Sequence, residues 1–177
     1  MRQFVALASV LLLSGCAFNI GSYGSSIDTV ESIKRQNLPP VSLAPFTATK
    51  PGVTTIYCRG TGPVETADKK PFESYIQEAM RDDLRLAGIY DPNSRFVLNG
   101  NLDAIDFSSN MGVARWMITL SVSGTKPGYA TSIQHQFSTN FVGDKACQQV
   151  AGAFVPAVQK LVQQVAENPQ FKTLFAN

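Results

Sequence analysis

The sequence predicts one α+β domain, a two-layer sandwich in which two helices cover one face of a mainly antiparallel four-stranded sheet. Two helical repeats of apolar residues and four segments typical of strands follow one another in the order β-α-β-β-β-α. A meander that is apolar on one side buries only that side, so both helices are expected against it. The 177 residues suffice for one core, and a hydrophobic content of 44% excludes a mainly disordered chain.

The first half of the body should contain one strand and one helix. Segment 53–58 is β-branched and aromatic, which predicts a strand. From Phe72 to Ala87, apolar residues recur at three- and four-residue spacing, which predicts a helix. Asp68 is the expected N-cap of this helix, and Gly88 is expected to end it as the C′ residue.

Three strands and a second helix should follow. Segment 96–107 places Leu98, Leu102 and Ala104 on one parity. Segments 114–123 and 131–141 then alternate between apolar and polar residues, which is typical of strands buried on one face. A final helix, capped by Asp144, carries an apolar stripe over 150–165.

The N-terminus has the pattern of an export signal. Arg2 precedes an apolar run over 4–13, which is shorter than the roughly 20 residues that a membrane-spanning helix needs. The run ends in Leu13-Ser14-Gly15-Cys16, which resembles the lipobox of bacterial lipoproteins. The resemblance implies removal of residues 1–15 and a diacylglycerol on the Cys16 thiol. The alternative is an ordinary signal peptide with a chance cysteine at this place.

The resemblance also implies an address and a division of the chain. Ala17, and not Asp, follows the cysteine, which favours the outer membrane with the body facing the periplasm. Residues 16–40 are expected to be a lipidated flexible tether, because 19–26 is rich in Gly and Ser and a Pro39-Pro40 step closes the segment. A short helix over 28–36, capped by Ser26, could interrupt it. Residues 41–177 are expected to be the periplasmic α+β domain.

Two further cysteines, Cys58 and Cys147, remain once Cys16 is lipidated. The periplasm is oxidising, so a disulfide between them is the expected pairing. The alternative is two buried thiols. A thioredoxin-like role is disfavoured because the chain has no C-x-x-C motif.

The order of elements also resembles small Gram-negative envelope lipoproteins, the YajG family first and, more distantly, the LptE-like and ABC-transport auxiliary lipoproteins. The resemblance covers roughly residues 41 to 175. Its parts are the helix that ends at Gly88, the segment 97–102, Trp116 in an alternating strand, and the Phe154…Val158…Leu161 repeat. Members of the broader group act as non-catalytic partners of envelope machinery, so the resemblance implies such a role here.

Charge and composition exclude several classes of function. Fifteen Lys and Arg against thirteen Asp and Glu give a net charge of +2, so no basic nucleic-acid footprint is expected. A serine-hydrolase centre would need His135, the only histidine, but Ser132 and Ser138 lie on the opposite parity. Asp103 and Asp106 are the carboxylates that an envelope hydrolase could use. The sequence predicts no catalytic or metal site, and no cofactor besides the lipid on Cys16.

The candidate binding surface is the polar side of the sheet. It should carry hydrogen-bonding side chains with little net charge: Arg115, Thr119, Ser121, Gln134, Gln136, Ser138 and Asn140. A free sheet edge is an alternative contact surface, and Met111 is a candidate apolar contact in a loop. The leading hypothesis is therefore a non-enzymatic, membrane-anchored module that binds another envelope component. The alternative is a carrier that holds a lipid or hydrophobic ligand between helices and sheet.

Overall fold

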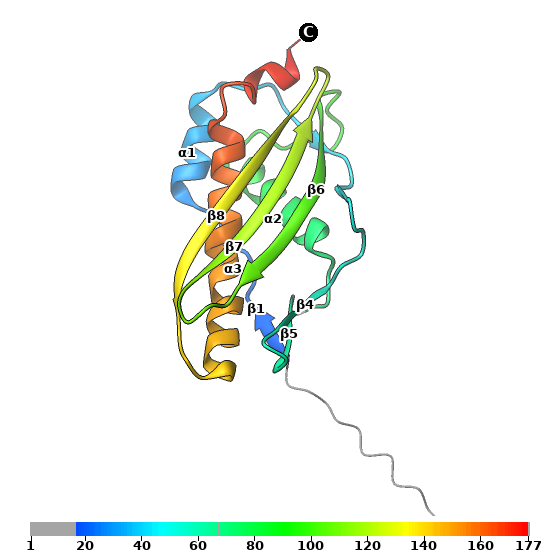
Figure 1. Cartoon of the computed structure of the whole chain (residues 1–177). Coiled ribbons are helices and arrows are strands. Elements are labelled where there is room, and N and C mark those ends of the chain that lie inside the picture. The colour runs from blue at the N-terminus through cyan, green and yellow to red at the C-terminus, as the bar shows by residue number, and fades with distance from the viewer. Residues whose placement is uncertain (1–16, 67, 177) are drawn as a thin grey trace, which may run out of the picture.

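The computed structural model describes residues 17–66 and 68–176. The helices are α1 (Ile27–Arg35), α2 (Phe72–Leu86), α3 (Gly143–Glu167) and the 3-10 turn η1 (Lys172–Phe175). The strands are β1 (Phe18–Ile20), β2 (Ser42–Leu43), β3 (Thr47–Ala48), β4 (Thr55–Cys58), β5 (Gly62–Thr66), β6 (Val97–Ser108), β7 (Gly112–Ser123) and β8 (Tyr129–Thr139). Figure 1 shows the long strands β6–β8 lying across α3.

The main sheet is built on the antiparallel meander β6-β7-β8. The short strands β2 and β3 pair parallel to the outer edge of β6. In β7, every second residue from Ala114 to Val122 is buried, while the residues between them are partly exposed. This strict alternation places one face of the sheet against the helices and leaves the other to solvent.

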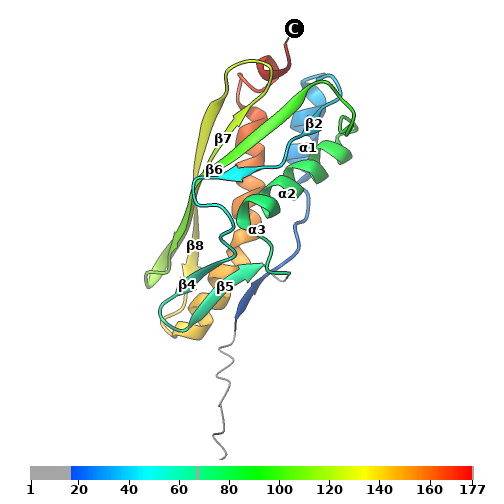
Figure 2. The same cartoon turned by 90° about the vertical axis from the view of Figure 1, so that its right-hand side faces the viewer.

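The α+β class and the two-layer arrangement are confirmed, with the helices on one side of the sheet (Figure 2). The predicted strand over 53–58 forms, as β4, but it does not join the main sheet. It pairs with β5 in a hairpin whose turn has positive φ at Arg59 and Gly60, and β1 takes the other edge of β5. Because β2 and β3 occupy the edge of β6, β4 belongs to a separate three-stranded sheet.

The core is centred on a cluster of aromatic rings between the sheet and the helices. Trp116 of β7 and Phe154 of α3 are fully buried, with ring centroids 4.8 Å apart. Phe72 and Tyr75 of α2 pack on Phe154 at 5.4 and 5.2 Å. The Trp116 Nε1–H also donates a hydrogen bond to the Val150 carbonyl, 2.9 Å away, so the buried indole has a polar partner.

The expected tether over 16–40 is wrong for residues 18–36, which fold onto the body. β1 pairs parallel to β5, and Ile20 is buried. Val30 and Ile33 of α1 are buried as well, on the inner side of that helix. The Gly- and Ser-rich composition of 19–26 allowed flexibility, but burial of these three apolar side chains outweighs it. Cys16 itself lies outside the described residues.

Two details of the helix ends and strands also differ from expectation. The N-caps of α2 and α3 are Pro71 and Val142, and neither Asp68 nor Asp144 caps a helix. A β-bulge at Asp103 shifts the register of β6 against β7, so Ala104 is exposed instead of facing the core. Gly88 does end α2 in the predicted left-handed conformation, at φ 79°.

The predicted disulfide joins Cys58, at the end of β4, to Cys147, in the first turns of α3. Both residues are fully buried, and their Cα atoms are 5.8 Å apart. The bridge closes a loop of 89 residues that contains β5, α2 and the whole meander.

No helix in the described part of the chain is long and apolar enough to cross a bilayer.

Removing the disulfide should destabilise the protein substantially. For a loop of this length the chain-entropy model gives a loss of about 4 kcal/mol. We expect the Cys58→Ala/Cys147→Ala variant to show this loss in urea denaturation. Dithiothreitol should destabilise the parent protein and leave the variant unaffected. An unchanged midpoint on reduction of the parent would contradict a stabilising role.

Candidate binding surface

The outer face of the sheet, formed by the outward residues of β6, β7 and β8, is the candidate binding surface. No helix of the described chain covers it, and it lies on the viewer's side of the sheet in Figure 1. Six of the seven predicted residues project from it: Arg115, Thr119 and Ser121 from β7, and Gln134, Gln136 and Ser138 from β8. The three on β8 are exposed and the three on β7 partly exposed, as expected for central and edge strands.

Cross-strand hydrogen bonds order the side chains of this face. The Thr119 and Ser132 hydroxyls lie 2.9 Å apart, and the Arg115 guanidinium donates to the Gln134 amide oxygen at 3.2 Å. The Ser121 hydroxyl donates to an Asp103 carboxylate oxygen at 2.5 Å. Such pairs hold polar side chains in defined positions before any partner arrives, which lowers the entropy lost on binding.

Sequence reasoning missed part of this surface. The second Asp103 oxygen accepts a hydrogen bond from the Asn101 amide at 2.7 Å, and Thr47 of β3 donates to Asn101 at 2.8 Å. The sequence indicates Asp103 only as a carboxylate that a hydrolase could use, whereas the bulge brings it into the hydrogen-bonded network of the outer face. The available signal for the bulge is a change of parity in the apolar pattern, because Leu98 and Leu102 share one parity whereas Ile105 and Phe107 follow on the other.

Asn140 and Met111 lie apart from the other predicted residues. Asn140 follows the last residue of β8, and its side-chain oxygen accepts from the Val142 amide at 2.9 Å. It therefore shapes the turn into α3 instead of lining the outer face. Met111, in the β6–β7 turn, is 67% exposed.

The candidate hydrolytic groups are separated by the sheet. His135 is partly buried on the inner parity of β8, while Ser132 and Ser138 are exposed on the outer parity. Burial, with a smaller contribution from the Lys160 ammonium, lowers the pKa of His135 below its usual value. Asp106 lies on the exposed face of β6, so it does not meet His135 either.

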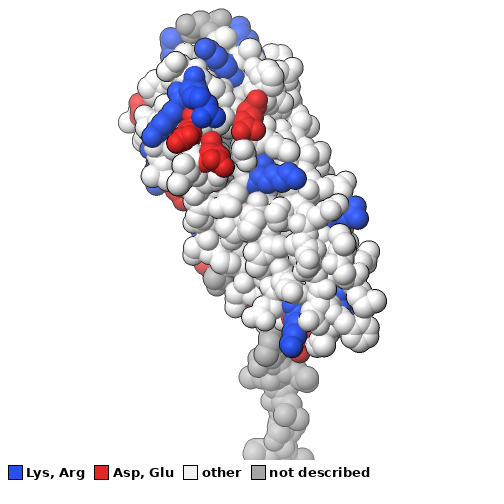
Figure 3. Space-filling view, turned by 90° about the vertical axis from the view of Figure 1, so that its left-hand side faces the viewer, with Lys and Arg blue, Asp and Glu red and all other residues white. Residues whose placement is uncertain are grey.

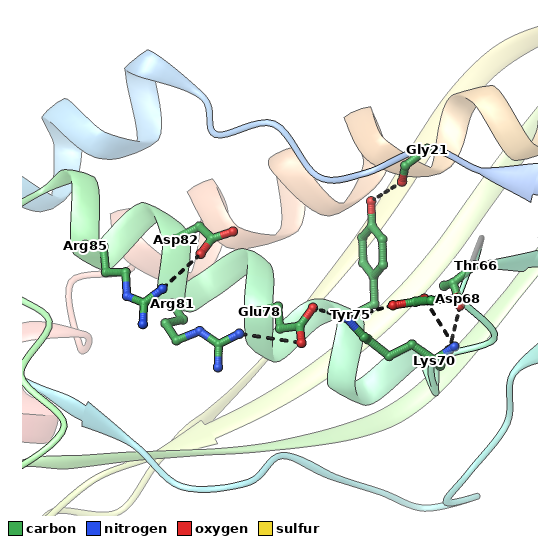
Figure 4. Close-up of polar contacts among 9 residues, drawn as sticks. All are labelled: Gly21, Thr66, Asp68, Lys70, Tyr75, Glu78, Arg81, Asp82 and Arg85. Atoms are coloured by element: carbon green, nitrogen blue, oxygen red, sulfur yellow. Dashed lines mark hydrogen bonds and ion pairs between the residues drawn. The ribbon is translucent and has the colours of Figure 1, made fainter.

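A surface hollow lies between the N-terminal segment and α2 and has a volume of about 290 Å³. Figure 4 shows the Lys70 ammonium between the carboxylates of Asp68 and Glu78. These two carboxylates raise the pKa of Lys70. On the far side, the Tyr75 hydroxyl donates to the Gly21 carbonyl at 2.8 Å. The charged groups here are paired with one another, and the hollow's walls join the N-terminal segment to α2.

Asp83 fixes the same segment from inside. Its side chain is fully buried and accepts a hydrogen bond from the Tyr23 hydroxyl at 2.8 Å. Burial, which disfavours the charged form, raises the pKa of this carboxyl above its usual value of 3.8, and the Asp82 charge adds to the rise. Burial also raises the pKa of Tyr23. The pair therefore acts as a clamp between α2 and the chain that enters the fold.

Comparisons with known proteins bear on the fold. A crystal structure of protein XCC0632 from Xanthomonas campestris, described under the family DUF330, superimposes with a TM-score of 0.53 at 8% identity, over 89% of this chain and 98% of that one. The chain shares the fold of this DUF330 protein. A second solved structure, of an uncharacterized protein, matches with a TM-score of 0.43 at 8% identity, over 83% and 97% of the two chains. No family model and no curated protein matches the sequence.

The clamp predicts a pH-dependent stability. A carboxyl whose pKa is raised on folding binds protons more tightly in the folded state, so its contribution falls as pH rises through the folded pKa. Asp83→Asn, which can still accept from Tyr23, removes this dependence. We expect the difference in unfolding free energy, variant minus parent, to increase from pH 4 to pH 7 in urea titrations.

The matched control is Asp28→Asn, because Asp28 is exposed on α1 and its charge does not contribute to the raised pKa of Asp83. Its difference from the parent should change little over the same pH range. A constant difference for Asp83→Asn across the range would show that this carboxyl is not titrating with a raised pKa.

Proposed function

We propose that this protein is a lipid-anchored, non-catalytic binding module of the Gram-negative cell envelope, held at the outer membrane with its body in the periplasm. The lipobox-like Leu-Ser-Gly-Cys16 sequence supports the anchor. The observation that carries the binding role is the outer face of β6–β8. It is uncovered by the described helices and ordered by cross-strand hydrogen bonds, and it carries little net charge because Arg115 is offset by Asp103 and Asp106. Within this proposal the chain is a relative of the YajG-like lipoproteins, and the DUF330 likeness supports the fold only.

The dimensions of this face suit a macromolecular partner. Strands of 11 or 12 residues are roughly 36 to 40 Å long, and three of them span about 10 Å in width between outer strand axes. With side chains included, this approaches the roughly 800 Å² that each partner contributes to a standard interface. Hydroxyl and amide groups favour a partner recognised by hydrogen bonds, such as an envelope protein or a glycan polymer, because no strong field is present to steer a charged one.

The packing of the core argues against the alternative, a carrier with a ligand between helices and sheet. A carrier needs an apolar cavity in that space. Here Trp116, Phe154 and Phe72 occupy it, and all three are fully buried with ring centroids about 5 Å apart. A ligand would have to displace this cluster.

The anchor can be tested by metabolic labelling. Palmitate should enter the wild-type protein in a Gram-negative host and should be lost from Cys16→Ala. Cys58→Ala/Cys147→Ala is the matched control, because it removes two cysteines and keeps the lipobox. Equal labelling of the wild type and Cys16→Ala would refute the anchor.

The binding face can be tested by crosslinking in intact cells. A photoreactive side chain at Ser132 or Gln136, both exposed on the outer face, should capture a discrete envelope component. Adding Gln134→Arg should lower that capture at least tenfold. A charge introduced into the interface without an opposite charge on the partner should cost more than about 1.4 kcal/mol of binding free energy.

The matched control is Gln164→Arg, the same substitution at an exposed position of α3. Both variants should keep the unfolding free energy within about 0.5 kcal/mol of the parent. Equal loss of capture in both variants, or capture that ignores Gln134→Arg, would contradict a binding role for the outer face.

A further inference from the structure

Exposed apolar side chains gather at the end of the molecule that carries β1. Eight large hydrophobic residues of the described chain are exposed, and five of them belong to elements that meet at this end. We call these five the apolar tip: Tyr57 (72% exposed), Met111 (67%), Val113 (54%), Phe141 (77%) and Val142 (50%). Figures 1 and 2 both show the β4–β5 turn, the β6–β7 turn and the β8–α3 connection at this end.

Arg59 ties these three connections together. From the β4–β5 turn its guanidinium donates to the Ser109 carbonyl in the β6–β7 turn. It also donates to the carbonyls of Asn140 and Phe141, 3.4 and 3.2 Å away, in the β8–α3 connection. The Cys58–Cys147 disulfide adds a covalent link behind it. The apolar tip is therefore held by a rigid frame, and its exposed side chains are not on independent loops.

The chain enters the fold at the same end. Ala17 and Phe18 line a surface hollow together with Asp144 and Lys145 of the first turn of α3, directly after the Phe141-Val142 pair. Only Ala17 separates Cys16 from β1, and two extended residues reach about 7 Å. A lipid on Cys16 would hold this end of the body against the headgroups, because residues 18–36 are folded and supply no slack.

The charge distribution is consistent with such an orientation. On the face seen in Figure 3, Lys, Arg, Asp and Glu gather toward the end that carries α1 and the C-terminus. Below that cluster the surface seen in Figure 3 is mostly uncharged, and a few charged side chains reappear at the β1 end beside the grey chain. Aromatic and aliphatic side chains without strong charge are the composition that favours the boundary between headgroups and acyl chains.

We propose that the apolar tip inserts into the bilayer interface, so that the body stands on the membrane with the outer face of β6–β8 turned sideways to the periplasm. The inference rests on the proposed function, because it takes the lipid on Cys16 as the first attachment. The tip is then the second attachment. Two attachments fix the orientation of the body, and a single acyl anchor on a flexible leader would not.

The test is fluorescence quenching by brominated lipids. The full chain is produced in a Gram-negative host, and the mature protein is reconstituted into phosphatidylethanolamine–phosphatidylcholine vesicles. Trp116, the only native tryptophan, is fully buried and gives a constant background. The indole introduced by Phe141→Trp should show a blue shift on reconstitution, and brominated acyl chains should quench it.

The matched control is Leu86→Trp at the end of α2, where the native side chain is 59% exposed and lies away from the tip. Its emission should be neither shifted nor quenched. Unquenched emission from Phe141→Trp on a folded protein would overturn the proposal, and it would leave the tip as a contact for a protein partner.

Mass spectrometry of the same preparation separates the two hypotheses. Acyl groups on Cys16 with no quenching at position 141 would refute the tip and keep the anchor. If Cys16 carries no acyl group, the anchor hypothesis is refuted. Membrane insertion of the apolar tip can then still be tested by mixing the unacylated protein with vesicles of brominated lipid. Quenching of the Phe141→Trp indole would then support insertion without a lipid, and its absence would refute it.

Discussion

The packing of α3 across the meander is the interaction on which the rest of the structure depends. Trp116 stands between the sheet and this helix, with its ring against Phe107 and Phe154 and its N–H on the Val150 carbonyl. An indole buried this deeply requires a hydrogen-bond acceptor, and an acceptor on α3 sets the helix at one position along the strand. α1, α2 and β1 then pack around α3, and η1 closes the end of the molecule beyond it.

This arrangement explains why the N-terminal segment is part of the body. β1 completes the small sheet at β5. Two residues of α2 hold the chain that follows: Asp83 accepts a hydrogen bond from the Tyr23 hydroxyl, and the Tyr75 hydroxyl donates to the Gly21 carbonyl. A segment held to the body at this many points is not a flexible tether. The distance between membrane and body in our proposal therefore follows from one residue, Ala17, instead of from two dozen.

Much of the architecture could be predicted because its signals are local. The alternation around Trp116 predicts β7, the three- and four-residue spacing predicts α2 and α3, and Gly88 ends α2 as expected. β5 was missed because Gly62 and Pro63 begin it, and these residues usually interrupt strands. β1, β2 and β3 have two or three residues each and leave no periodic pattern. Their existence depends on neighbours that are distant in the sequence.

The sequence by itself determined the α+β class and the polar side of the sheet, because composition and a period of two residues suffice for these. It left Cys58 and Cys147 as either a disulfide or two buried thiols, and the tertiary structure decided for the disulfide. Only the tertiary structure decided that β4 leaves the main sheet, that Asp103 joins the outer face, and that the apolar tip forms. Tyr57, Met111 and Phe141 are scattered singly along the chain, where an exposed apolar residue is ordinary. Their shared position arises from a frame of Arg59 hydrogen bonds and a disulfide, and such non-local contacts have no signature in any one segment.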